Sequence, residues 1–71
     1  MSAPTNAERA FWADEALKAF IAHTKSEPEY SLSDLLADLM HWSDHAGLSF
    51  EEELYRARYH YRTEALEGGA P

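Results

Sequence analysis

LSDLLADLMHWSDHAG, residues Leu32 to Gly47, is the most informative stretch of this 71-residue chain. As an α-helix it carries apolar residues at the i, i+3, i+4, i+7 spacing of a single stripe. Ser31 and Asp34 resemble a capping box with Asp in place of Glu, which predicts the start of the helix. Gly47 predicts its end, because glycine readily adopts the left-handed conformation. The predicted buried stripe consists of Leu32, Leu35, Leu36, Leu39, Trp42, Ser43 and Ala46.

A first helix is predicted over residues 6–24, because Thr5 and Glu8 form a capping box before an amphipathic run. Residues 25–31, KSEPEYS, form the connector to the next helix, since Pro28 cannot continue a helix and restricts the residue before it. The apolar residues of the first helix define one face that we expect to be buried. That face consists of Ala10, Ala13, Leu17, Phe20, Ile21 and Thr24.

A third helix is predicted over residues 50–67, with Ser49 and Glu52 as its capping box. Glu51, Glu52 and Glu53 suit the positive end of the helix dipole. Because the turn at Gly47 is short, we expect this helix to run roughly antiparallel to the one before it. Its predicted core stripe consists of Phe50, Leu54, Ala57 and Tyr61.

These patterns predict an all-α fold, a small antiparallel three-helix bundle that forms one domain over residues 6–67. Residues 1–5 and 68–71 are predicted to be disordered tails. A chain of this length buries only about 60% of its unfolded surface, so its core is marginal. Cysteine is absent, which excludes disulfides, and dimerisation is the expected source of additional stability.

The net charge is −7 at pH 7, and this excess of acidic residues limits the kinds of partner that the protein is expected to bind. Nucleic acids and anionic membranes are bound through Lys and Arg, so neither is an expected direct partner. The sequence has no signal-peptide pattern and no apolar run of about 18 residues. Together with the absence of cysteine, this predicts a cytoplasmic protein. A basic partner protein would suit the charge, although acidity also serves solubility alone.

A second apolar stripe lies on the third helix, away from its predicted core face. Tyr55, Tyr59, Arg62 and Leu66 follow the i, i+4, i+7, i+11 spacing. Phe11 and Trp12 likewise lie off the core face of the first helix. Three short helices cannot bury two faces internally, and Tyr, Trp and Arg are enriched at binding hot spots. These six residues are therefore the predicted interface, most simply of a homodimer, although exposed tyrosine is also tolerated by water.

A second face of the central helix carries polar residues at steps of four, three and four, namely Asp34, Asp38, His41 and His45. Histidines four apart on a helix can bind one ion, and this mixture of ligands would suit zinc, manganese or iron. The alternative is a solvated face with weak surface ion pairs and no cofactor. No nucleophile elbow, phosphate-binding loop or cysteine nucleophile accompanies these residues, so no catalytic residue is assigned.

Residues 37–54, ADLMHWSDHAGLSFEEEL, resemble the C-terminal half of the MazG-like nucleotide pyrophosphohydrolases. The resemblance implies an all-helical, oligomeric protein that holds magnesium through paired carboxylates on two helices. Asp34 and Asp38 would be the second pair, but they are spaced by four residues rather than three. Asp14 and Glu15, which are adjacent, offer no matching first pair. DLLADLMHWSDHAG also resembles small uncharacterised all-helical proteins of proteobacterial mobile elements.

The favoured hypothesis is a non-enzymatic, acidic helical protein that acts by binding itself, another protein, or both. One alternative is a metal-binding protein or a metal-dependent, MazG-like nucleotide hydrolase that uses the Asp/His face. Another is an acidic mobile-element inhibitor that blocks a nucleic-acid-binding protein, since its charge could occupy a basic site.

Overall fold

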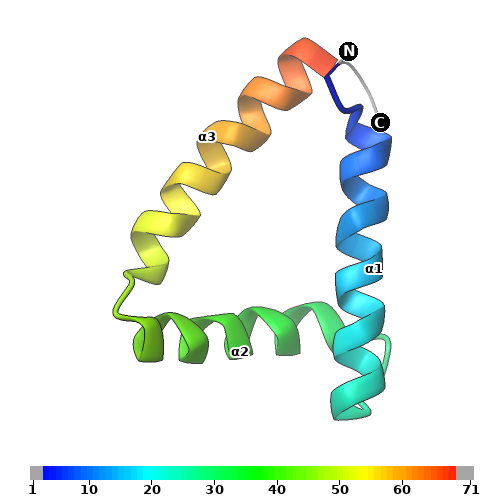
Figure 1. The fold of residues 1–71 in the computed structure, drawn as a ribbon, viewed down its shortest axis with the longest axis vertical. Coiled ribbons are helices and arrows are strands. Elements are labelled where there is room, and N and C mark those ends of the chain that lie inside the picture. The colour runs from blue at the N-terminus through cyan, green and yellow to red at the C-terminus, as the bar shows by residue number, and fades with distance from the viewer. Residues whose placement is uncertain (1–2, 69–71) are drawn as a thin grey trace.

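The computed structural model describes residues 3–68, which form three α-helices and no β-strand (Figure 1). The helices are α1 (Asn6–Thr24), α2 (Ser31–Ala46) and α3 (Phe50–Gly68). The predicted all-α class is confirmed, and each helix bound lies within one residue of its predicted position. Gly68, which was assigned to the C-terminal tail, extends α3 by one residue. Residues 3–5 have no regular secondary structure, and the rest of both predicted tails lies outside the described residues.

The predicted capping box of α1 is confirmed. The Thr5 hydroxyl accepts a hydrogen bond from the Glu8 amide at 3.1 Å, and the Glu8 carboxylate accepts one from the Thr5 amide at 2.9 Å. At the start of α3, the Ser49 hydroxyl accepts a hydrogen bond from the Glu52 amide at 3.3 Å. These bonds satisfy amide groups that have no partner inside the helix, so both helices begin where the sequence predicts.

The capping box predicted at Ser31 and Asp34 is wrong. Tyr30 is the N-cap of α2 and makes no capping hydrogen bond through its side chain. Ser31 instead lies in the first turn, where its hydroxyl donates to the Pro28 carbonyl at 2.9 Å. Asp34 accepts a hydrogen bond from the Ser26 hydroxyl at 2.5 Å. The turn that follows Pro28 leads directly into α2. The side chains of Ser31 and Asp34 therefore form hydrogen bonds with the connector instead of capping the helix.

Gly47 ends α2 as predicted, with a left-handed φ of 74°. The Leu48 amide donates to the Ser43 carbonyl at 2.9 Å, and the Gly47 amide donates to the Asp44 carbonyl at 3.3 Å. This pair of bonds is the Schellman motif, which satisfies carbonyls at the end of the helix. Lys25 ends α1 with a similar φ of 60°, although it is not glycine.

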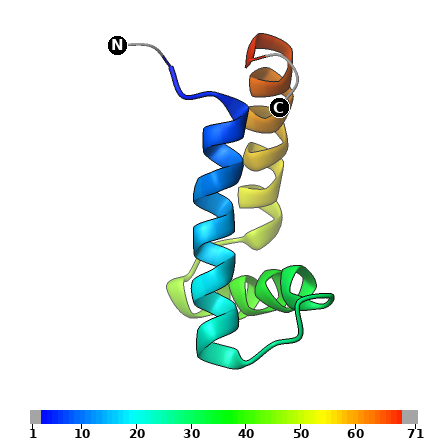
Figure 2. The same cartoon turned by 90° about the vertical axis from the view of Figure 1, so that its right-hand side faces the viewer.

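The three helices form the sides of an open triangle (Figure 1). The start of α1 approaches the end of α3 at one corner, and α2 crosses between the other ends of α1 and α3. The chain reverses at Gly47 as expected, but α3 diverges from α2 and does not pack along its length. Figure 2, turned by 90°, shows α1 and α3 extending in the same direction from α2, with the last turns of α1 passing beside α2. The described chain therefore has contacts mainly at its corners.

The prediction that the apolar stripes form a buried core is wrong. Among residues 3–68 no apolar side chain is buried, and the two buried residues are Ser31 and Ser43. The predicted faces of α1 and α3 are only partly covered: Leu17, Phe20, Ile21, Phe50 and Leu54 are half-buried, and the other members are exposed. Helices that meet only at their corners cannot cover these faces along their length. The apolar stripes therefore face a space that one copy of the chain does not fill.

Candidate interaction surface

An exposed apolar surface lies on α2. It is the face that the sequence predicted as core, and only Leu35 and Ser43 in it are not exposed. We call its four large exposed members the α2 apolar face, and no charged residue belongs to this face of the helix. These members are Leu32, Leu36, Leu39 and Trp42, with exposed fractions between 40% and 62%.

The total accessible surface of the chain is larger than that of a compact monomer of the same mass. The chain exposes 6132 Å², whereas a compact monomer of 8.1 kDa exposes about 4,500 Å². The excess, about 1,600 Å², is comparable to what a substantial protein interface covers. Monomeric proteins rarely leave contiguous apolar patches of more than a few hundred Å² uncovered.

The predicted interface residues of α3 are all exposed. We call Tyr55, Tyr59, Arg62 and Leu66 the α3 tyrosine stripe, and their apolar members have exposed fractions of 67–87%. Phe11 and Trp12 on α1 are also more than half exposed. Adjacent residues on a helix project about 100° apart, so these two do not form one patch. The structure thus leaves all six residues accessible but groups only the four on α3.

The Asp/His face of α2 does not converge on one point. Asp34 and Asp38 line a shallow hollow beside Phe20, Thr24 and Ser26, where the end of α1 meets the start of α2. His41 and His45 are exposed further along the helix. Within the described residues, no group of three or more His, Cys, Asp or Glu is arranged to hold a metal ion. A metal site on this face stays a prediction that would need ligands from a second chain.

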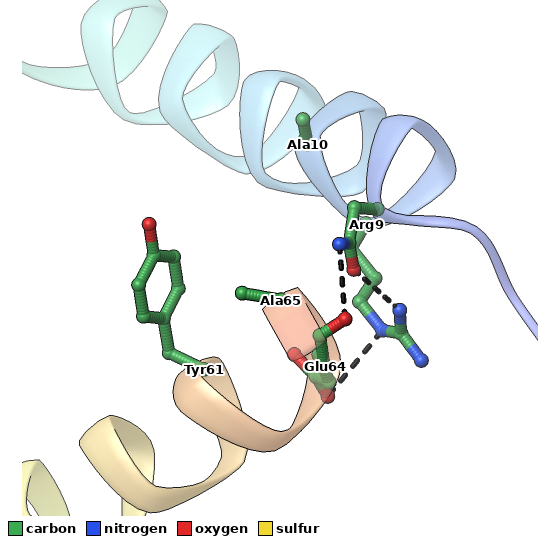
Figure 3. Close-up of a pocket in the computed structure, with 6 residues that line it drawn as sticks. Arg9, Ala10, Tyr61, Glu64 and Ala65 are labelled. Atoms are coloured by element: carbon green, nitrogen blue, oxygen red, sulfur yellow. Dashed lines mark hydrogen bonds and ion pairs between the residues drawn. The ribbon is translucent and has the colours of Figure 1, made fainter. Parts of the chain in front are cut away.

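A polar corner joins α1 to α3, and sequence analysis did not identify it (Figure 3). Arg9 Nε lies 3.3 Å from Glu64 Oε2, and Asn6 Nδ2 donates to the Glu64 carbonyl at 3.1 Å. Asn6 Oδ1 accepts a hydrogen bond from Arg9 Nη1 at 2.7 Å. Residues 58 positions apart in the chain carry no periodic signal that would have paired them. This corner closes the triangle between the start of α1 and the end of α3.

The corner borders a pocket of about 310 Å³, which Ala10, Tyr61 and Ala65 also line. Figure 3 shows Tyr61 on the α3 side of this pocket, facing α1. The charges of Arg9 and Glu64 compensate each other, and Tyr61 is 72% exposed. The pocket therefore combines a neutralised rim with an apolar wall that is open to solvent. It offers no pairing of a nucleophile with a base, and its chemistry suits packing against another apolar group.

No family model, curated protein or solved structure matches this chain. The resemblances to MazG-like enzymes and to mobile-element proteins therefore stay predictions. Within residues 3–68, no helix combines the length and the apolar character needed to cross a bilayer. The function has to be argued from the exposed surfaces themselves.

Proposed function

We propose that this protein is non-enzymatic and acts through protein–protein interaction, with a second copy of itself as its first partner. One observation carries the proposal: no apolar side chain is buried among the described residues, although each helix carries several apolar residues. A single hydrophobic core is the main stabilising contribution in a domain of this size. A chain that cannot close a core alone is stabilised by association.

The area involved suits a homodimer. If each of two copies covered its excess of about 1,600 Å², the pair would bury roughly 3,000 Å² in total. Obligate homodimers bury areas of this order, and their interfaces resemble a domain core cut in half. A smaller, transient contact would leave most of the apolar surface in water.

Charge supports the α2 apolar face as part of the contact. Two copies with a net charge of −7 repel each other, so they associate best through surfaces without excess negative charge. The α2 apolar face meets this condition, because the charged residues of the Asp/His face do not belong to it. The acidic outer surfaces would then remain free for a further, regulatory partner. The absence of cysteine supports a cytoplasmic setting for this role.

The experiment compares native mass in solution for the wild type and two lysine variants. Leu36→Lys places a charge on the α2 apolar face and should convert the dimer to a monomer. His41→Lys is the matched control, because it adds lysine to an exposed position of the same helix and should leave the dimer intact. Both positions are exposed in the single chain, so neither change removes a buried contact within it. A monomeric wild type would overturn the proposal, and a dimeric Leu36→Lys would remove α2 from the interface.

A further inference from the structure

One row of residues along α3 carries acidic, aromatic and basic side chains in an order that is complementary to the same row of a second, antiparallel copy. Glu51, Tyr55, Arg58 and Arg62 follow one another at steps of four, three and four residues, so they share one side of the helix. The row lies about 100° around the helix from Phe50, Leu54 and Tyr61, which belong to the inner face. All four members of the row are exposed.

The charged members of this row have no ion-pair partner within the described chain. Arg9 pairs with Glu64, Lys18 pairs with Asp14 at 2.9 Å, and Arg56 pairs with Glu53 at 2.7 Å. These bridges leave Lys25, Arg58 and Arg62 as the cations without an ion pair among residues 3–68. Arg58 and Arg62 are four residues apart, a spacing at which like charges repel along a helix. An opposing acidic or aromatic group would relieve this repulsion.

We infer that α3 pairs with α3 of a second copy in an antiparallel arrangement, with the two-fold axis passing between the levels of residues 56 and 57. This inference rests on the proposed self-association and assigns its register. In that register Glu51 lies opposite Arg62 of the other copy, and Tyr55 lies opposite Arg58 of the other copy. By symmetry, each dimer contains two Glu–Arg ion pairs and two Tyr–Arg contacts.

Charge excludes the parallel alternative. In a parallel two-fold pair each residue of the row would face its own copy, so that Glu51, Arg58 and Arg62 would each meet a like charge. The antiparallel register instead places opposite charges together at both ends of the row. It also brings Leu66, which is 87% exposed, to the level of Gly47 of the other copy, beside Leu48. The most exposed large apolar residue of the described chain would thus cover the turn between α2 and α3.

The test uses charge reversal and measures the dimer dissociation constant by sedimentation equilibrium at low salt. E51R and R62E should each raise the Kd by roughly tenfold to a hundredfold, because two attractive pairs become repulsive. If net charge alone controlled association, the result would differ. E51R lowers the net negative charge of the chain, so it would strengthen the dimer. The double variant E51R/R62E should restore a Kd near that of the wild type.

Two controls make the register specific. E52R/R62E has the same composition of charges as the double swap, but residue 52 projects about 100° away from the row, so it should not restore the dimer. An equimolar mixture of E51R with R62E should form a heterodimer, because each reversed residue then meets its complement. Helical circular dichroism that matches the wild type should accompany every variant, and heterodimer formation would show independently that both single variants fold.

The outcomes separate this inference from the proposed function. If the wild type is dimeric and the single reversals keep its Kd, the α3 register is wrong and self-association stands. That result would also be expected if Arg58 and Arg62 bound an acidic partner protein instead. Failure of the mixture to associate, or rescue by E52R/R62E, would likewise overturn the register. A monomeric wild type would overturn both proposals.

Discussion

Two residues with left-handed backbones close the ends of α1 and α2, and only one of them is glycine. At Gly47 an added Cβ would meet no atom within 4 Å, so space is not limiting there. The cost of a substitution is therefore the backbone strain of an L-residue at a φ of 74°. Gly47→Ala should lower the free energy of unfolding by about 1 kcal/mol. Urea denaturation at fixed protein concentration checks this, and an unchanged midpoint would contradict it.

Lys25 offers the reverse experiment. It holds a φ of 60° as the C-cap of α1, and its amide donates to the Ile21 carbonyl at 2.8 Å. Lys25→Gly should raise the free energy of unfolding by about 0.5–1 kcal/mol, because glycine adopts this conformation without strain. Lys25→Ala keeps the strain and removes the charge, so it should have little effect. If Lys25→Gly and Lys25→Ala stabilised the protein equally, the gain in stability would come from removal of the lysine charge instead.

At the scale of elements, the polar corner connects two helix ends that are far apart in sequence. Asn6 contacts both Arg9 and the Glu64 backbone, so Asn6→Ala should cost about 1 kcal/mol. Glu64→Ala should cost less, because the backbone bond survives and the ion pair is partly solvated. Hydrogen exchange should show faster opening at the C-terminal end of α3 in Asn6→Ala alone. The same exchange rate in both variants would contradict this assignment.

Substitutions in the α3 tyrosine stripe should dissociate the dimer without unfolding its helices. Tyr59→Glu combined with Leu66→Glu should convert the dimer to a monomer while helicity is kept, since both side chains are already exposed in the single chain. Native mass and far-ultraviolet circular dichroism together provide the readout. A double variant that retains the dimer mass would show that this stripe is not part of the self-interface.

Local sequence signals located the helices well. Thr5 with Glu8, Ser49 before Glu52, and Gly47 act through hydrogen bonds within a few residues, and the structure contains each of them. Ser31 failed as a cap because the turn after Pro28 competes for its hydroxyl. That competition depends on the geometry of the connector, which a spacing pattern does not encode.

Burial was predicted poorly for a different reason. Periodicity identifies which face of a helix is apolar, and about half of the residues predicted for the inner faces of α1 and α3 are half-buried. It does not say what covers that face, and Leu36 and Leu39 on α2 are not covered within the chain. The ion pair between Arg9 and Glu64 was not predicted, because it depends on how α1 and α3 are arranged in space. The α3 tyrosine stripe is exposed, and its role as an interface stays a prediction.

At the scale of the whole molecule, association should stabilise the fold. If the dimer is the folded unit, the Tm must rise with protein concentration, because dilution favours the unfolded monomer. A series from low to high micromolar concentration, scanned by calorimetry, checks this expectation. A Tm that is independent of concentration would indicate a fold that is stable as one chain.

The central claim is that one copy does not complete its own core, and the native mass of the wild type in solution tests it most directly. Sedimentation equilibrium at low micromolar concentration should give twice the 8.1 kDa mass of the chain. The same mass should persist in the presence of a chelator, because the apolar faces rather than a metal ion would hold the copies together. A mass of 8.1 kDa in both buffers, from a chain that is fully helical, would contradict the account.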